Sequence, residues 1–465
     1  MSRLDQPVGP FLFARKSVAA TGGDLNTKEK MNASSASNRT ETFFSAGESF
    51  ADGAMIELVS GSSKLSKPNL LLWNGCEATL GPRVEHDGCT YEAPDLDPIL
   101  YRATRFPSQC SDYGSARGLF GGIRDLFRHH LGLSESESGL LTCFAISTWL
   151  ADRLPTAPTL AISGRDEELG IDVLRLLSCV CRHPLMLGEV TPGGFRSLPM
   201  QLSLTLLLNQ QVLRPNLQRL FRASSFRGLY LPGIGGRVVN AYGAKAIFCG
   251  DDAADTLTDG MMHIFVVSSE LQPPALDEQV QNEIASQVQS RLLMYRLKNL
   301  EKVSASRVDV SKFTFAKRPM ARTLAMSFPE DLELARDVVQ LLGPQDEEVR
   351  AQRSFDVNCA IVETLWYMLH DGKQREVGVD ALARGVNALL CSRGEIKEYS
   401  AEEIGWKLRN LDIPRHSNSA GRQVLFGRDT SRCVHRLSRI YELQCSNLVE
   451  AGCPDCGQPQ PLISK

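Results

Sequence analysis

Residues 159–180 read TLAISGRDEELGIDVLRLLSCV, and this stretch decides how the middle of the chain is interpreted. The apolar run at 159–163 has the length of a buried strand, and Gly164 opens a turn. The residues that follow place Leu174, Leu177 and Val180 on one helical face. The stretch therefore predicts a strand, a turn and a helix, which is a building unit of α/β sheets.

The turn has the layout of a phosphate-binding loop without its residues. Such a loop, GxxxxGK[ST], needs glycine backbone N–H groups, a lysine and a hydroxyl that holds Mg²⁺. Counting back from Gly170 puts Arg165 at the first glycine. Ile171 then falls at the lysine and Asp172 at the hydroxyl. Three carboxylates at 166–168 fill the loop, and their charge opposes the binding of a triphosphate.

Further short apolar runs follow, separated by helical or turn-rich stretches. They are LTLLL at 204–208, AKAIFCG at 244–250 and HIFVVS at 263–268. This alternation indicates an α/β sheet layer, with a helical segment before it and helical stretches after about residue 280.

Several blocks of sequence resemble the P-loop ATPase domain of phage and plasmid primase-helicases, in both order and spacing, over about residues 100–270. The blocks are TPGGFR at 191–196, TLLL at 205–208, LFRAS at 220–224 before Arg227-Gly228, YGAKAI at 242–247 and DTLTD at 255–259. The resemblance implies a RecA/AAA-like P-loop core. It also implies assembly into rings for active relatives.

The sequence departs from this family at the positions that bind and hydrolyse the nucleotide. Asn209 and Gln210 stand where the Walker B acids belong, and Gly260 replaces an arginine. Lys245 is either a leftover sensor or a solvated lysine. Because phosphoryl transfer depends on these groups, we expect no hydrolysis, no catalytic residue and no bound ATP or Mg²⁺. Two alternatives stay open: an unrelated α/β domain, and an active ATPase that uses unconventional residues or a partner in trans.

The tail reads as helix, helix, hairpin and helix, which matches a winged helix-turn-helix. Between residues 405 and 440 there are eight basic residues and only two acids, in a chain of net charge −3. We expect the helix at about 401–411 to enter the DNA major groove, with the hairpin as the wing. The alternative is a dimerisation or interdomain module. The candidate nucleic-acid-binding residues are Lys407, Arg409, Arg415, Arg422, Arg428, Arg432, Arg436 and Arg439. Trp366 and Trp406 are expected in the core.

The tail also holds a CxxC knuckle, Cys453-Pro454-Asp455-Cys456, which is the geometry of half a zinc site. The other half would have to come from Cys433, His435 or Cys445. A single knuckle is a weak signal, so we expect no metal and a pair of free thiols. The thirteen cysteines are scattered through apolar stretches, and no signal peptide or membrane-length run is present. We therefore expect reduced thiols, a cytoplasmic location and no membrane contact.

The sequence predicts a mixed α+β chain of seven segments. They are a disordered N-terminus (1–40), a small β-rich lead-in (41–100), a helical segment (101–155), a degenerate P-loop ATPase-like core (156–275), a helical linker region (276–375), a winged-helix-like domain (376–443) and a Cys-containing tail (444–465). The leading hypothesis is a catalytically silent scaffold that binds nucleic acid, with DNA favoured, through its C-terminal domain. The rivals are an ATP-driven motor and a protein-interaction scaffold that assembles with itself or with a protein partner.

Overall fold

The computed structural model describes residues 42–61, 67–233, 237–250, 260–267, 274–304, 307–371, 375–418, 421–448 and 453–456. The chain forms two compact units, Met1–Gly343 and Pro344–Lys465. The disorder expected at residues 1–40 lies outside the described residues. No helix among the described residues is long and apolar enough to cross a membrane.

The first unit begins with the expected β-rich lead-in, which forms two small sheets in the strand orders β1-β7-β6 and β2-β3-β4-β5. Their apolar side chains share a core cluster with the central sheet, in which Ile56 and Leu58 meet Leu206 and Ile247. The bounds are β1 Thr42–Phe44, β2 Gly47–Ser49, β3 Met55–Val59, β4 Asn69–Trp73, β5 Ala78–Gly81, β6 Arg83–His86 and β7 Cys89–Glu92.

A buried ion cluster ties the lead-in to the rest of the unit. Glu57 of β3 accepts hydrogen bonds from Arg182 at 2.6 and 2.8 Å and from Arg296 at 2.7 Å. Asp152 lies on the far side of the same two guanidinium groups. Burial alone would raise the pKa of Glu57, but Arg182 and Arg296 hold it well below its usual value. The lead-in is therefore anchored by charges that are almost fully out of water.

The central sheet has five strands, all parallel, in the order β14-β8-β13-β10-β9. The side chains of the three central strands alternate between two core clusters, so both faces of the sheet are covered. This confirms the predicted mixed α/β organisation with a parallel sheet. The strands are β8 Thr159–Ser163, β9 Pro184–Leu187, β10 Thr205–Asn209, β13 Lys245–Cys249 and β14 Met262–Phe265; a small ribbon pairs β11 Leu231–Pro232 with β12 Val238–Val239.

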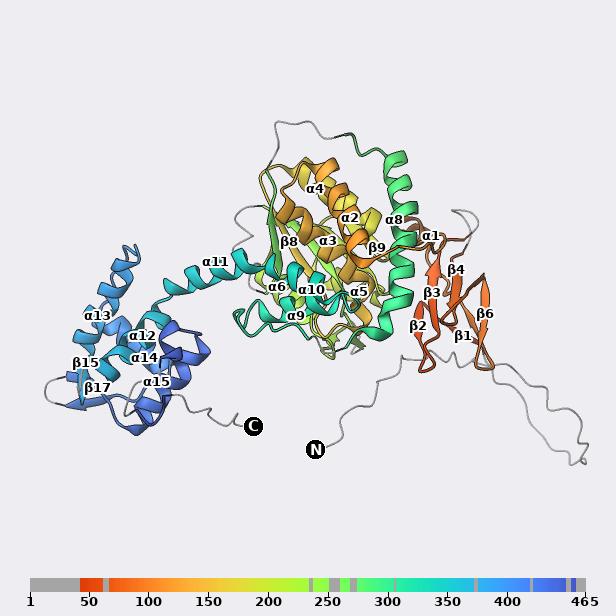
Figure 1. The fold of residues 1–465 in the computed structure, drawn as a ribbon. Coiled ribbons are helices and arrows are strands. Elements are labelled where there is room, and N and C mark those ends of the chain that lie inside the picture. The colour runs from red at the N-terminus through yellow and green to blue at the C-terminus, as the bar shows by residue number, and fades with distance from the viewer. Residues whose placement is uncertain are drawn as a thin grey trace, which may run out of the picture. The chain divides into compact units, whose positions relative to one another are not determined.

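Helices cover one face of the sheet, and short helices with the lead-in cover the other. The lead-in strands, red and orange in Figure 1, lie beside the long helix α8. The first face is covered by α2 Ala116–Leu131, α3 Glu135–Trp149, α4 Glu167–Val180, α8 Glu278–Asn299, α9 Arg318–Met326 and α10 Leu332–Gln340. The second has α1 Pro98–Ala103, α5 Pro192–Ser197 and α6 Pro215–Ala223. Helices α8 to α10 lie in the segment 276–375, which the sequence predicts to be a helical linker region. In the structure they pack into this unit.

The second unit contains the predicted helix, helix, hairpin and helix, preceded by two more helices and a short strand. Its sheet has the order β15-β17-β16, and its helices from Val357 onward share one apolar core around Trp366 and Leu382 (Figure 1, blue). The elements are α11 Gly343–Ser354, α12 Val357–Asp371, β15 Glu376–Gly378, α13 Val379–Ser392, α14 Ala401–Asn410, β16 His416–Asn418, β17 Gly421–Leu425 and α15 Arg428–Ile440.

Candidate functional site

The carboxyl ends of the five parallel strands meet at one edge of the central sheet. The strand register places Ser163 beside Cys249 and Phe265, and Asn209 beside Phe248. Open parallel sheets bind ligands outside this edge. The turn after β8 and the polar residues after β10 therefore form the first candidate site.

The turn between β8 and α4 is short. Only three residues separate Ser163, the last residue of β8, from Glu167, the first of α4. Ile171 and Asp172 consequently lie inside the helix and not at its mouth, and Asp172 forms an ion pair with Arg175 at 2.8 Å. So short a turn offers few backbone N–H groups with which to surround a phosphate.

The two glycines of the predicted loop serve close packing. At Gly164, where φ is 159°, a Cβ would lie 2.4 Å from the carbonyl oxygen of Val266. At Gly170 a Cβ would come within 2.3 Å of the Phe248 ring. Packing of α4 and β14 on the sheet accounts for both positions without a bound phosphate.

The protein's own acidic groups occupy the start of α4. Asp166 caps the helix and accepts a hydrogen bond from the backbone N–H of Leu169. Glu167 accepts a hydrogen bond from the Asn209 side chain at 3.1 Å, and Asn209 in turn accepts one from Gln211 at 3.0 Å. A helix N-terminus attracts anions, and here carboxylates of the chain itself already fill that role.

Gln210 has a different position from Asn209. Its side chain is buried, accepts a hydrogen bond from the Val190 backbone N–H at 2.7 Å and donates one to the Val212 carbonyl at 2.9 Å. The amide thus braces the segments after β9 and β10. A neutral amide can serve both partners, whereas a carboxylate could only accept.

An open hollow with a volume of 720 Å³ lies over the start of α4 and the end of β14. One wall is apolar and partly exposed, and the other carries three carboxylates beside a single arginine. The lining residues are Arg165, Asp166, Glu167, Glu168, Phe265, Val266 and Val267. A triphosphate in this hollow would face a net negative wall.

Lys245 and Gly260, the remaining residues of the predicted nucleotide site, lie elsewhere. Lys245 begins β13, at the amino edge of the sheet, and its buried ammonium group donates to the Ser225 hydroxyl at 3.1 Å and the Gly243 carbonyl at 2.8 Å. Gly260 precedes the amino end of β14. The structure therefore does not bring either residue to the carboxyl edge.

Lys245 gives a testable pH dependence. Burial lowers its pKa from 10.5 to about 7, so between these values the unfolded chain binds a proton that the folded chain does not. Wild-type stability, relative to Lys245→Met, should therefore fall as pH decreases from about 10 to about 7. A tenfold change in proton affinity corresponds to ~1.4 kcal/mol, so the difference in the free energy of unfolding should reach a few kcal/mol. Urea unfolding of both proteins across this range measures it, and parallel stability profiles would contradict it.

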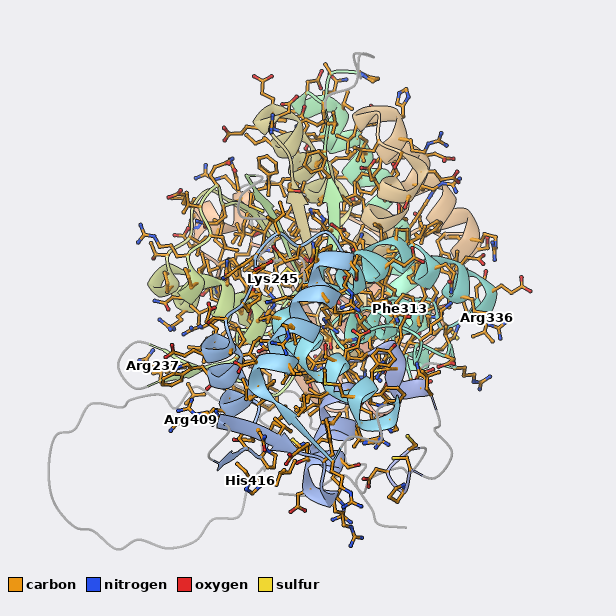
Figure 2. The ribbon with its side chains drawn as sticks, turned by 90° about the vertical axis from the view of Figure 1, so that its left-hand side faces the viewer. Arg237, Lys245, Phe313, Arg336, Arg409 and His416 are labelled. Atoms are coloured by element: carbon orange, nitrogen blue, oxygen red, sulfur yellow. The ribbon has the colours of Figure 1, made fainter. Side chains whose placement is uncertain are left out.

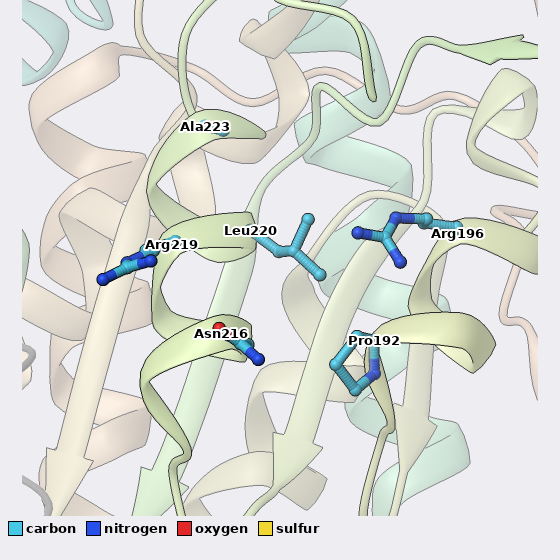
Figure 3. Close-up of a pocket in the computed structure, with 6 residues that line it drawn as sticks. All are labelled: Pro192, Arg196, Asn216, Arg219, Leu220 and Ala223. Atoms are coloured by element: carbon cyan, nitrogen blue, oxygen red, sulfur yellow. The ribbon is translucent and has the colours of Figure 1, made fainter. Parts of the chain in front are cut away.

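A second hollow, of 430 Å³, lies between α5 and α6. It is lined by Pro192, Arg196, Asn216, Arg219, Leu220 and Ala223, which fall in or beside two of the blocks shared with the primase-helicases. In Figure 3, Arg196 and Leu220 point toward each other, while Arg219 extends to the other side of α6. Both arginines line the hollow, and the Arg196 side chain is the one that points toward α6.

The second candidate site is the basic part of the second unit. Arg415 donates to the backbone carbonyl of Gly405 in α14 at 2.5 Å. The Arg422 guanidinium lies 3.9 Å from the point where a Cβ of Gly405 would be. The hairpin arginines thus gather over α14, which itself carries Lys407 and Arg409. None of these four cations is in an ion pair with a described carboxylate.

Trp406 departs from its predicted place in the core. It is 56% exposed on α14, whereas Trp366 is 1% exposed and confirms the prediction. The periodicity was misleading because the buried side of α14 consists of Ile404, Gly405 and Leu408, and Trp406 points outward. The Arg409 guanidinium is 5.8 Å from the Trp406 ring centroid. Figure 2 labels Arg409 and His416, both of which are exposed.

The arginines of α15 divide into two groups. Arg428 and Arg436 are exposed and have no described carboxylate partner. Arg432 lies 3.9 Å from the carboxylate of Asp455, and Arg439 donates to the Asp455 carbonyl at 3.2 Å. Asp455 belongs to the CxxC knuckle, so Arg432 and Arg439 already contact the tail.

The two knuckle cysteines lie beside His370 and His435. The sequence did not predict His370 here, because it precedes Cys456 by 86 residues and no motif spacing connects the two.

No family model and no curated protein matches the chain. Among solved structures, the chain is similar to a full-length MCM homolog from Methanopyrus kandleri (10% identity, TM-score 0.35, covering 63% of this chain and 78% of that one). It is also similar to two A-form apo structures of the NrS-1 C-terminal region. One is 12% identical with a TM-score of 0.35, covering 80% and 97% of the two chains. The other is 11% identical with a TM-score of 0.32, covering 80% and 96%. Scores of this size do not define a shared fold.

Proposed function

We propose that this protein binds double-stranded DNA through a winged-helix module formed by its second unit. The observation that carries the proposal is the position of Arg415 and Arg422 of the hairpin region against α14 at Gly405, one helical turn from Arg409. The order of helices and strands in the unit supports the winged-helix assignment. In such a module α14 enters the major groove and the β16–β17 hairpin acts as the wing.

The charge pattern of this face supports contact with phosphate. Side chains that lack a carboxylate partner are available to neutralise DNA, and each neutralised phosphate releases a counterion. Trp406 adds an exposed aromatic ring beside Arg409. Arg428 and Arg436 extend the basic surface along α15, in positions suited to phosphate contacts that orient a protein without reading sequence.

We further propose that the first unit is a P-loop-like core that neither binds nor hydrolyses ATP. The strand, turn and helix from β8 to α4 have the layout of a phosphate site, which supports the relationship that the sequence resemblance implies. The short turn, the Glu167 carboxylate on Asn209 and the acidic hollow oppose a triphosphate there. The core would then be a scaffold for the DNA-binding unit.

The test is fluorescence anisotropy of a labelled duplex titrated with the full chain. We expect the wild type to bind, and Arg409→Ala to weaken binding by ~1 kcal/mol and reduce the salt slope by about 1. Arg336→Ala is the matched control, because it removes one exposed arginine from α10 of the first unit (Figure 2). Equal losses in both variants, or wild-type binding that does not change with salt, would contradict the proposed face.

A further inference from the structure

Four side chains with metal-binding atoms converge in the second unit. His370 of α12, His435 of α15, Cys453 and Cys456 place one ligand atom each within 4.8 Å of all the others. The Cys456 sulfur lies 3.3 Å from Nε2 of His370 and 3.3 Å from Nε2 of His435. The Cys453 sulfur lies 3.5 Å from Nε2 of His435. The group joins α15 and the loop that follows it to the distant helix α12.

Both histidines are oriented by the helices that carry them. Nδ1 of His370 lies 2.7 Å from the Trp366 carbonyl, and Nδ1 of His435 lies 2.8 Å from the Ser431 carbonyl. A carbonyl can only accept, so each Nδ1 carries the hydrogen. The lone pair of the neutral ring is then on Nε2, which faces the two sulfurs. Metal-binding histidines are fixed in this way by a partner on the second nitrogen.

Hydrogen bonding between thiols and imidazoles does not account for the cluster. With neutral rings protonated at Nδ1, the only hydrogens available between the sulfurs and Nε2 atoms are the two thiol hydrogens. The group makes three short sulfur–nitrogen contacts, so one contact would place two lone pairs against each other. A shared cation bound by two thiolates and two imidazoles satisfies all of them.

We propose that these four residues bind one Zn²⁺ ion as a structural site. Zinc–sulfur bonds of ~2.3 Å and zinc–nitrogen bonds of ~2.0–2.1 Å in a tetrahedron imply sulfur–nitrogen separations of about 3.5 Å. The observed 3.3–3.5 Å agrees. A tetrahedral set of two sulfurs and two nitrogens favours zinc, and four protein ligands leave no position for a substrate.

The knuckle is also held by polar contacts around the four ligands. Asp455 accepts a hydrogen bond from the Ser431 hydroxyl at 2.7 Å, and its backbone carbonyl accepts one from Arg439. The ion would therefore fix the 453–456 segment on α15 and join α12 to α15. The site places a cross-link on the helix that also carries Arg428 and Arg436. It is independent of whether that helix contacts DNA.

The test is the zinc content of the purified full chain, measured by elemental mass spectrometry after dialysis. We expect about one zinc ion per chain in the wild type. Cys456→Ser and His370→Gln should each retain much less zinc than the wild type after dialysis, because each variant removes one of the four ligands. Cys391→Ser is the matched control, because Cys391 is an exposed thiol of the same unit outside the cluster, and it should retain wild-type zinc.

Cobalt substitution of the wild type tests the ligand set without relying on any variant. Metal-stripped protein refilled with Co²⁺ should show the strong visible bands of tetrahedral cobalt together with a thiolate-to-cobalt band in the near ultraviolet. Wild-type protein that takes up neither zinc nor tetrahedral cobalt would overturn the proposal. So would retention of wild-type zinc by either Cys456→Ser or His370→Gln.

Discussion

Replacing Glu57 with alanine should lower the free energy of unfolding of the first unit by about 3–5 kcal/mol. The carboxylate is buried between Arg182 and Arg296. Its loss leaves two guanidinium groups out of water, with Asp152 as their only acidic partner among the described residues. Removing one partner of a buried ion cluster is costly because the remaining charges stay desolvated.

Urea unfolding monitored by circular dichroism measures this loss. Glu85→Ala is the matched control, because Glu85 is an exposed carboxylate of β6 in the same lead-in, and its removal should change stability by less than about 0.5 kcal/mol. The same stability for both variants would mean that the lead-in is not anchored through Glu57. Glu57→Gln should recover part of the loss, since the amide oxygen can still accept from one arginine.

Combined replacement of Lys407, Arg409 and Arg422 by alanine should have the largest effect on DNA binding. Each phosphate contact contributes about 0.9 to the slope of log affinity against log salt, so the slope should decrease by about 3. At low salt the affinity should fall on the order of 100-fold. Anisotropy titrations of a labelled duplex at several salt concentrations give both quantities.

A charge-matched control separates this face from general attraction to DNA. Arg128, Arg291 and Arg336 are exposed arginines on α2, α8 and α10 of the first unit, and their triple replacement by alanine removes the same total charge. We expect this control to keep nearly the wild-type slope. If the control loses as much affinity as the α14 and hairpin variant, DNA binding is not localised to the second unit.

The sheet and the tail helices could be predicted because the periodicity of apolar residues indicates which side chains are buried. The run at 159–163 became β8, and Leu174 and Leu177 pack in the core as their spacing indicated. Strand β9 could not be found in this way. The apolar pattern continues up to Cys181, but α4 ends at Val180, Cys181 is extended, and the chain turns at His183, whose φ is 43°. Propensity alone does not reveal such a local reversal.

The features that could not be predicted from the sequence depend on tertiary contacts. Glu167 reaches Asn209 only because parallel strands bring the ends of β8 and β10 to one edge. His370 reaches the CxxC knuckle because α12 packs against α15. Neither juxtaposition leaves a trace in residue spacing. The sequence therefore predicts Lys245 and Gly260 as members of the nucleotide site and free thiols in the tail.

The most direct test is the affinity of the full chain for duplex DNA across a range of salt concentrations at one fixed free Mg²⁺ concentration, with and without ATP. We predict a linear fall of log affinity with log salt and the same curve in both series, because the second unit binds DNA while the acidic start of α4 excludes the nucleotide. DNA binding that is independent of salt would contradict the proposed basic face. A shift of the curve caused by ATP would contradict the proposal that the carboxyl edge of the sheet is closed to triphosphate.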